Sequence, residues 1–246
     1  GDQLTADLGG NENATQSIFI VENPGDATQY FLFFTQEVPN STGATQYEFS
    51  YAVFDLKMLD GDGDLVRDGG GNPIITTLFN NSTERITGNA NWVIVHEYGN
   101  DIFRAYPLVA QGVGNPVFSN AGQIHSATAT SAKGYMNLSA DKLAVALSIS
   151  NSENYIDLFD FDINTGAITS VVALDFPQNG QVYGVEFSPD NRKLYATLLD
   201  QAGGSSVHRW EIDTTTIATN STDPQYIQDS ELLVATEGTI EMGALQ

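Results

Sequence analysis

The stretch Phe187–Tyr195, FSPDNRKLY, indicates the fold of this chain, because a second copy of it occurs earlier in the sequence. The earlier copy is Leu138–Ala144, LSADKLA, which matches at the first apolar residue, the serine, the aspartate and the Lys-Leu pair. The offset is 49 residues before the turn and 51 residues after it, so the later copy has the longer turn. Proline presets φ for a turn, and Asp and Asn tolerate an unusual backbone. The pattern predicts two strands joined by a tight turn, present at least twice.

The repeat extends beyond these two turns. Each copy is followed by an amphipathic strand that ends in an acid, Asp157–Asp162 in one unit and His208–Asp213 in the other. Tyr51–Asp55 and Ile102–Tyr106 look like the same strand in two earlier units. A period of roughly 40 to 50 residues is typical of a four-stranded propeller blade, which cannot bury both of its faces alone. We expect one propeller region over residues 1–246, with repeat units at roughly 14–80, 81–130, 131–178 and 179–236 and the start of another at 237–246.

Composition also favours an all-β chain. The sequence holds 23 glycines and 10% aromatic residues, and no window has apolar residues at the helical spacing of three and four. Short β-branched or aromatic runs recur between Asn, Gly, Asp and Ser clusters, as strands do between turns. The expected strands are Ser17–Val21, Tyr30–Thr35, Glu48–Asp55, Trp92–His96, Ile102–Pro107, Lys142–Ile149, Tyr155–Asp162, Val182–Ser188, Lys193–Leu199 and Ser206–Asp213.

The net charge of the chain limits the classes of molecule that it can bind. Its 246 residues include 9 Lys and Arg against 31 Asp and Glu, a formal net charge of −22. Nucleic-acid binding is disfavoured, because phosphate contacts depend on Lys and Arg that release condensed counterions. No stretch approaches the roughly 18 to 20 apolar residues of a membrane-spanning helix, so we expect no transmembrane segment. The absence of cysteine excludes disulfides, thiolate zinc sites and cysteine nucleophiles.

These residues resemble a known family. Gly184–Asp190 with Lys193–Tyr195 is similar to the repeat of YVTN/WD40-like seven-bladed β-propellers. The chain also resembles the N-terminal propeller region of Bacteroidetes surface proteins that often end in a gliding-motility-associated, type 9 secretion sorting domain. The matching segments are Ala14–Ser17, Trp92–His96, Phe103–Tyr106, Gly134–Met136, Glu153–Asp162 and Val182–Tyr195. The resemblance implies an exported protein at the outer cell surface or outside the cell.

Two departures from that family bear on the architecture. The chain supplies four to five units of roughly fifty residues, fewer than a seven-bladed ring needs. We therefore expect a partial ring, truncated at both ends, whose remaining blades belong to the same protein or to a partner chain. The stretch Ile86–Asn91 is short for an inner strand plus a turn, which predicts an irregular blade there.

An acidic cluster is the clearest candidate for a metal site. Asp60, Asp62, Asp64 and Asp68 lie in a glycine-rich stretch, and alternating carboxylates on such a backbone suit the oxygen-rich coordination of Ca²⁺. The EF-hand pattern fails, because Leu65 stands where glycine is required and Gly71 where a bidentate glutamate is required. The alternative is a solvated acidic hairpin loop, and the sequence leaves both interpretations open.

Other catalytic signals are sparse. His96, His125 and His208 are scattered along the sequence and are interpreted as structural histidines. There is no Gly-x-Ser-x-Gly motif, and no spacing singles out a catalytic pair of carboxylates. Aromatic residues such as Trp92 and Trp210 are assigned mostly to the core, as packing between blades, rather than to sugar stacking.

The resulting functional expectation is a non-catalytic extracellular module that binds protein or polysaccharide at the cell surface, as an adhesin or a scaffold. The alternative is a lactonase-like propeller hydrolase with a metal on the ring axis. A catalytic ring would converge acids or histidines at the starts of the inner strands. Tyr135, Val182 and Ile240 there are aromatic or apolar, although Glu186, Glu237 and Glu241 leave the enzyme alternative open.

Overall fold

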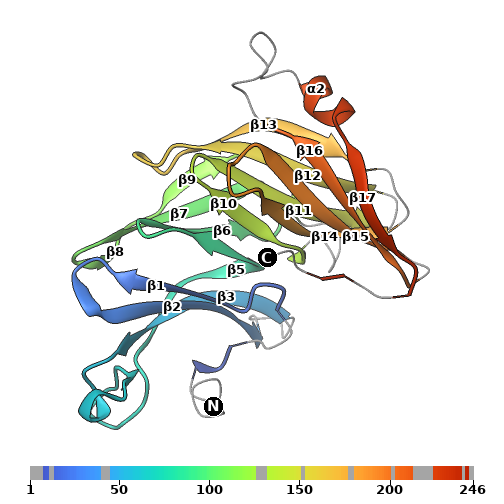
Figure 1. Cartoon of the computed structure of the whole chain (residues 1–246). Helices are drawn as coiled ribbons and strands as arrows, with labels where there is room; N and C mark the ends of the chain where they lie inside the picture. Colours follow the sequence, from blue (N-terminus) through green and yellow to red (C-terminus); the bar gives the residue numbers. More distant parts are fainter. Residues whose placement is uncertain are drawn as a thin grey trace. The chain divides into compact units, whose positions relative to one another are not determined.

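In the computed structural model, almost all of the regular secondary structure of the described residues is β-strand, and the chain forms two compact units (Figure 1). The first unit holds residues 1–98 and 103–118, and the second holds residues 99–102 and 119–246. The structure describes residues 8–10, 14–39, 45–125, 132–150, 153–176, 180–200, 203–212, 224–239 and 242–243.

The first unit is built on one antiparallel sheet, in the order β1-β2-β3-β5-β6-β7-β8, with β4 beside β3 and β9 beside β7. The strands are β1 (Ile18–Asn23), β2 (Asp26–Pro39), β3 (Thr45–Asp55), β4 (Asp64–Leu65), β5 (Ile75–Gly88), β6 (Trp92–Glu97), β7 (Ile102–Val109), β8 (Gly112–Val113) and β9 (Val117–Asn120), with a 3₁₀ turn, η1, at Leu59–Gly61.

The stretch Ile86–Asn91 does not contain a short inner strand, because Ile86 belongs to the 14-residue strand β5. The first half of β5 pairs with β3, and the second half pairs with β6. Asn81 stands between the halves with a φ of 73°, a left-handed conformation that asparagine tolerates better than most residues. The sequence therefore forms one continuous strand with register shifts in its pairing to β3 and β6, where the sequence predicted only an irregular blade.

An aromatic cluster holds the first sheet together. Phe33 of β2 lies opposite Tyr51 of β3, and the Phe33 ring also stacks on Phe49 at a centroid distance of 5.8 Å. Phe49 in turn contacts Phe79 of β5 and Tyr106 of β7. Such aromatic pairs contribute roughly 0.5–1.5 kcal/mol beyond their area burial.

The second unit contains two four-stranded up-and-down sheets, each with consecutive strands as neighbours. The first sheet has β10 (Met136–Ser139), β11 (Lys142–Ser150), β12 (Glu153–Phe161) and β13 (Ile168–Asp175). The second has β14 (Gly180–Phe187), β15 (Lys193–Asp200), β16 (Ser205–Glu211) and β17 (Leu232–Glu237), with the short helix α2 (Pro224–Asp229) before β17.

The internal repeat is confirmed by the strand registers. Leu138 of β10 pairs with Leu143 of β11, and Phe187 of β14 pairs with Leu194 of β15. Leu143 and Leu194 are both fully buried, as equivalent positions in a repeated core should be. The turn after Phe187 is closed by Ser188, whose hydroxyl donates to Asp190 over 2.6 Å.

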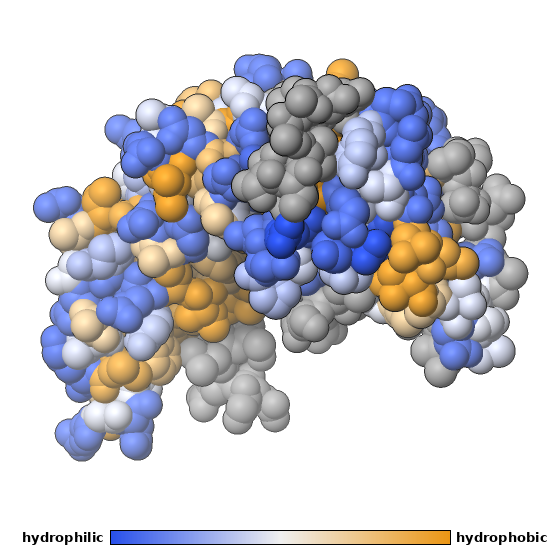
Figure 2. Space-filling model, turned by 45° about the horizontal axis from the view of Figure 1, so that its top comes forward, coloured by the Kyte–Doolittle hydropathy of each residue, from blue (hydrophilic) through white to orange (hydrophobic). Residues whose placement is uncertain are grey.

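Each of the ten expected strands overlaps a strand of the structure, although Asp213 lies outside the described residues. The strands β4, β5, β8, β9, β13 and β17 were not predicted, and neither was α2. None of the helices in the described part of the chain is long and apolar enough to cross a membrane. Figure 2 shows hydrophilic residues over much of the visible face, interrupted by separate hydrophobic patches.

Candidate functional site

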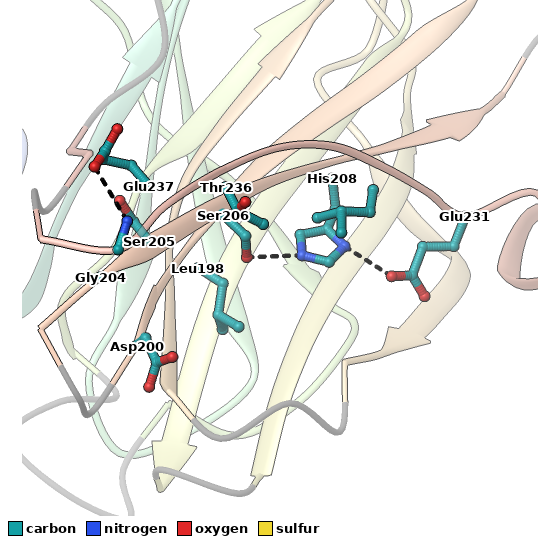
Figure 3. Close-up of a pocket in the computed structure, with 11 residues that line it drawn as sticks. Leu198, Asp200, Gly204, Ser205, Ser206, His208, Glu231, Thr236 and Glu237 are labelled. Carbon is teal, nitrogen blue, oxygen red and sulfur yellow. Dashed lines mark hydrogen bonds and ion pairs between the residues drawn. The ribbon is translucent and has the colours of Figure 1, made fainter.

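A pocket of about 680 Å³ lies on the second sheet of the second unit, at the ends of β15, β16 and β17 (Figure 3). This volume falls in the range of small-molecule sites. The pocket is lined by Leu198, Asp200, Gly204, Ser205, Ser206, His208, Glu231, Leu233, Thr236, Glu237 and Gly238.

Strand periodicity places Ser206 and His208 together. Residues two apart on a strand project from the same face, and both residues belong to β16. On one side they pair with Leu198 and Ala196 of β15. On the other side Ser206 pairs with Thr236 of β17, and the register between β16 and β17 shifts between Val207 and His208.

Glu231 lies next to His208 because α2 is docked against the sheet. Ile227 of α2 is buried, and the Ser230 hydroxyl accepts the backbone N–H of Glu211 over 2.9 Å and donates to the Ile227 carbonyl over 2.7 Å. These contacts hold the chain beside β16 at the residue before Glu231.

Three side chains form a hydrogen-bonded triad, Ser206–His208–Glu231. The Ser206 hydroxyl lies 2.8 Å from Nε2 of His208, and Nδ1 of His208 lies 2.8 Å from Oε1 of Glu231 (Figure 3). Because a carboxylate only accepts hydrogen bonds, Nδ1 carries the proton. In the neutral imidazole, Nε2 is then the acceptor and the serine hydroxyl donates to it.

Aromatic rings fix the orientation of the imidazole. Phe176 meets His208 edge-on at a centroid distance of 4.5 Å, and Trp210 lies nearly parallel to it at 6.3 Å. His208 is buried, whereas Ser206 is only partly buried and faces the pocket. Both residues line the pocket, and Ser206 is the more exposed of the two.

The described charged residues that line the pocket are all acidic. They include Asp200, Glu231 and Glu237, and none of the described residues that line the pocket is Lys or Arg. Gly204 lies at the rim of the pocket, close to β17. A Cβ at this position would lie 2.6 Å from the carbonyl oxygen of Glu237, so a larger residue would clash there. The pocket thus offers hydroxyl groups and negative charge to a ligand.

The proposed calcium ligands lie elsewhere, in the η1–β4 region of the first unit. Asp64 forms an ion pair with Arg67 over 3.0 Å, and this hydrogen bond is the main cause that lowers the pKa of the Asp64 carboxyl. Asp68 accepts the backbone N–H groups of Asn72 and Gly70, which lower the pKa of its carboxyl. Asp60 and Asp62 are exposed.

Within the residues that the structure describes, no three Asp, Glu or His side chains are grouped closely enough to hold a metal ion. The four aspartates therefore lie in one loop without converging on a common point, and calcium binding stays a prediction.

The other predicted candidates occupy separate places. His96 lies in the first unit, where burial lowers its pKa to about 3. His125 is buried in the second unit. Glu186 accepts a hydrogen bond from Asn137 over 2.7 Å, and burial raises the pKa of its carboxyl. Glu237 lines the pocket, and Glu241 lies outside the described residues.

The aromatic assignment is confirmed for both tryptophans, since Trp92 and Trp210 are buried. The sequence pattern did not predict the triad. The part of the triad that a sequence pattern can show is the Ser-x-His pair in a predicted strand. The glutamate lies outside any such local pattern, because it comes 23 residues after the histidine.

Comparisons with known proteins show the fold. No family model matches the chain, and no curated protein matches it. A candidate 6-phosphogluconolactonase of Bacteroides fragilis has a similar structure, with a TM-score of 0.52 and 9% identity over 92% of this chain and 74% of that one. A candidate 6-phosphogluconolactonase of Bacteroides uniformis has a TM-score of 0.42 and 13% identity, over 93% of this chain and 73% of that one. Together with the strand order, the first of these likenesses shows an all-β fold of the β-propeller type.

Proposed function

We propose that this chain is a binding module that takes a neutral, hydroxyl-rich ligand such as a carbohydrate in the pocket at the ends of β15, β16 and β17. The observation that carries the proposal is the lining. Carboxylates accept hydrogen bonds from ligand hydroxyls, and Ser and Thr hydroxyls both donate and accept them. Leu198 and Leu233 add apolar surface against which the carbon face of such a ligand can pack.

The same lining disfavours a phosphorylated sugar. Phosphate groups are bound by Arg, Lys or helix N-termini, and the described lining offers three carboxylates instead. The net charge of −22 adds a repulsive field for anions. The activity named for the similar Bacteroides protein therefore does not transfer to this pocket on chemical grounds.

A location at the cell surface is part of the proposal and is supported by the family resemblance of the repeat. In such a setting the ligand is a surface or environmental polysaccharide, and the propeller acts as the scaffold that presents the pocket. A protein partner is the alternative occupant.

Calorimetric titration of the full chain with neutral oligosaccharides, and with the corresponding sugar phosphates, tests this function. We expect saturable binding of a neutral sugar and no binding of its phosphate. Asp200→Ala should weaken binding about tenfold or more, and the nearly isosteric Thr236→Val should weaken it a few-fold.

Glu22→Ala is the matched control, because it also removes one carboxylate but from an exposed position in β1. Equal affinity for the sugar phosphate would contradict the proposal. So would a loss of binding in Glu22→Ala as large as that in Asp200→Ala.

A further inference from the structure

We infer that the triad Ser206–His208–Glu231 hydrolyses carboxylic esters in this pocket, with Ser206 as nucleophile, His208 as general base and acid, and Glu231 as the residue that orients the histidine. This activity goes beyond ligand binding, and it departs from the expectation of a non-catalytic module. It requires an acyl group on the ligand but does not require that the ligand be a sugar.

The geometry meets the requirements for an activated serine. The nucleophile lies within hydrogen-bond reach of a base, and the base lies within reach of a third group, both at 2.8 Å. The carboxylate of Glu231 fixes the tautomer that leaves Nε2 free to take the serine proton. The arrangement is recognised by these roles and not by sequence position.

The repeated fold does not impose this arrangement. In the preceding sheet Phe159 pairs with Leu143 as Trp210 pairs with Leu194, so Asp157 and Tyr155 occupy the positions equivalent to His208 and Ser206. The preceding sheet thus has neither a serine nor a histidine at these positions. Of these two sheets, only the one formed by β14 to β17 holds the triad.

The packing supports catalysis rather than a purely structural bond. Phe176 and Trp210 hold the ring, α2 holds the chain beside Glu231, and the partly exposed Ser206 lines the pocket. The neighbouring Ser205 differs, because it is buried and its hydroxyl accepts the backbone N–H of Met242 over 2.8 Å. Only one of the two adjacent serines is placed for attack.

The reaction balances without a further reactant besides water. Ser206 Oγ bonds to the acyl carbon while its proton moves to Nε2 of His208. The bond from that carbon to the alcohol oxygen then breaks, and the alcohol leaves with the proton from Nε2. Water attacks the acyl-serine, gives a proton to Nε2 and releases the carboxylic acid, after which Ser206 recovers its proton.

The lining also limits the substrate class. Asp200 and Glu237 lie beside the triad, so an anionic acid or alcohol portion is repelled. The geometry therefore favours short, uncharged acyl esters of neutral alcohols, of which O-acetylated sugars are one source and simple acetate esters another.

A covalent probe tests the nucleophile directly. The full chain is treated with a fluorophosphonate, digested with trypsin and analysed by fragmentation of the modified peptides. Cleavage after Lys193 and Arg209 gives the peptide Leu194–Arg209, in which fragmentation separates Ser205 from Ser206. We expect modification of Ser206, with Ser205 and Ser188 unmodified. Ser188 is the internal control, because its hydroxyl donates to a carboxylate and not to a histidine.

Hydrolysis of p-nitrophenyl acetate provides the second readout. Ser206→Ala should reduce the rate to the uncatalysed background, and Glu231→Gln should reduce kcat at least about tenfold.

Unmodified Ser206, or hydrolysis that survives Ser206→Ala in a variant with unchanged melting temperature, would overturn the inference. The labelling result stands even if a variant fails to fold. Because p-nitrophenyl acetate contains no sugar, failure of this test is distinguishable from failure of carbohydrate binding, which is measured by calorimetry.

Discussion

Leu194 of β15 lies directly opposite Trp210 of β16, and both side chains are fully buried in the core of the second unit. The pair anchors the strand that carries Ser206 and His208. Trp210 also contacts Phe176, which packs against the His208 ring. Core packing and the geometry of the pocket are therefore linked through β16.

Leu194→Ala should lower the free energy of unfolding by about 2 to 5 kcal/mol, because it removes apolar contacts and leaves a cavity. Urea denaturation monitored by tryptophan fluorescence measures the change. Val234→Ala is the control, since Val234 is exposed and its truncation should cost no more than about 0.5 kcal/mol. Equal effects of the two substitutions would contradict the packing described for β15.

Gly204 and Gly238 form a matched pair at the rim of the pocket. Gly204→Ala places a methyl group 2.6 Å from a backbone oxygen and should destabilise the protein by about 1 to 3 kcal/mol. Gly238→Ala meets no atom within 4 Å and should be tolerated. Urea denaturation of both variants tests this difference, and a tolerated Gly204→Ala would show that the loop can move away from β17.

Acidification should destabilise the protein through His96. Burial, assisted by the charge of Arg85, lowers the pKa of His96 to about 3 in the folded state, against about 6.5 when unfolded. Between these values the unfolded state binds a proton that the folded state does not, so stability falls as pH falls below about 6.5. From pH 7 to pH 5 this group removes about 2 kcal/mol.

Unfolding free energies of the wild type and His96→Gln, measured between pH 7 and pH 5, separate this contribution from that of the carboxylates. The variant should show the shallower pH dependence by about 2 kcal/mol over that interval. Parallel curves would mean that His96 titrates normally in the folded protein.

Calcium should raise the melting temperature if the loop of Asp60, Asp62, Asp64 and Asp68 binds it. At a hundredfold excess over Kd the stabilisation is about 2.7 kcal/mol. Asp62→Asn with Asp64→Asn should abolish the shift between calcium and chelator. Since Asp64→Asn also breaks the ion pair with Arg67, only the calcium-dependent difference within each variant is informative. A shift that persists in the double variant would exclude these ligands.

The strand pattern was largely predictable, because apolar alternation and turn residues act locally. The repeat around Leu138 and Phe187 also identified equivalent core positions correctly. The strand β5 was not predictable in this way, since its Asn- and Ser-containing centre favours a turn when considered alone. Pairing with β3 on one half and β6 on the other satisfies its backbone groups and overrides that local preference.

The site was less predictable than the fold. Ser206 and His208 are neighbours on one strand face, but that pattern is common among half-buried strands. The third member, Glu231, depends on the docking of α2 through Ile227 and Ser230, which is a tertiary contact. No local pattern in the sequence encodes it.

The continuity of β5 determines where the chain can be divided without cutting a strand. A break between residues 80 and 81 would cut one strand whose halves pair with different neighbours, so that each half of β5 would become an edge strand. Breakpoints in the connection between β13 and β14 would instead leave each four-stranded sheet intact. The strands from β1 to β8 therefore form one continuous sheet, whereas the second unit is divided between β13 and β14 into two sheets that share one buried core.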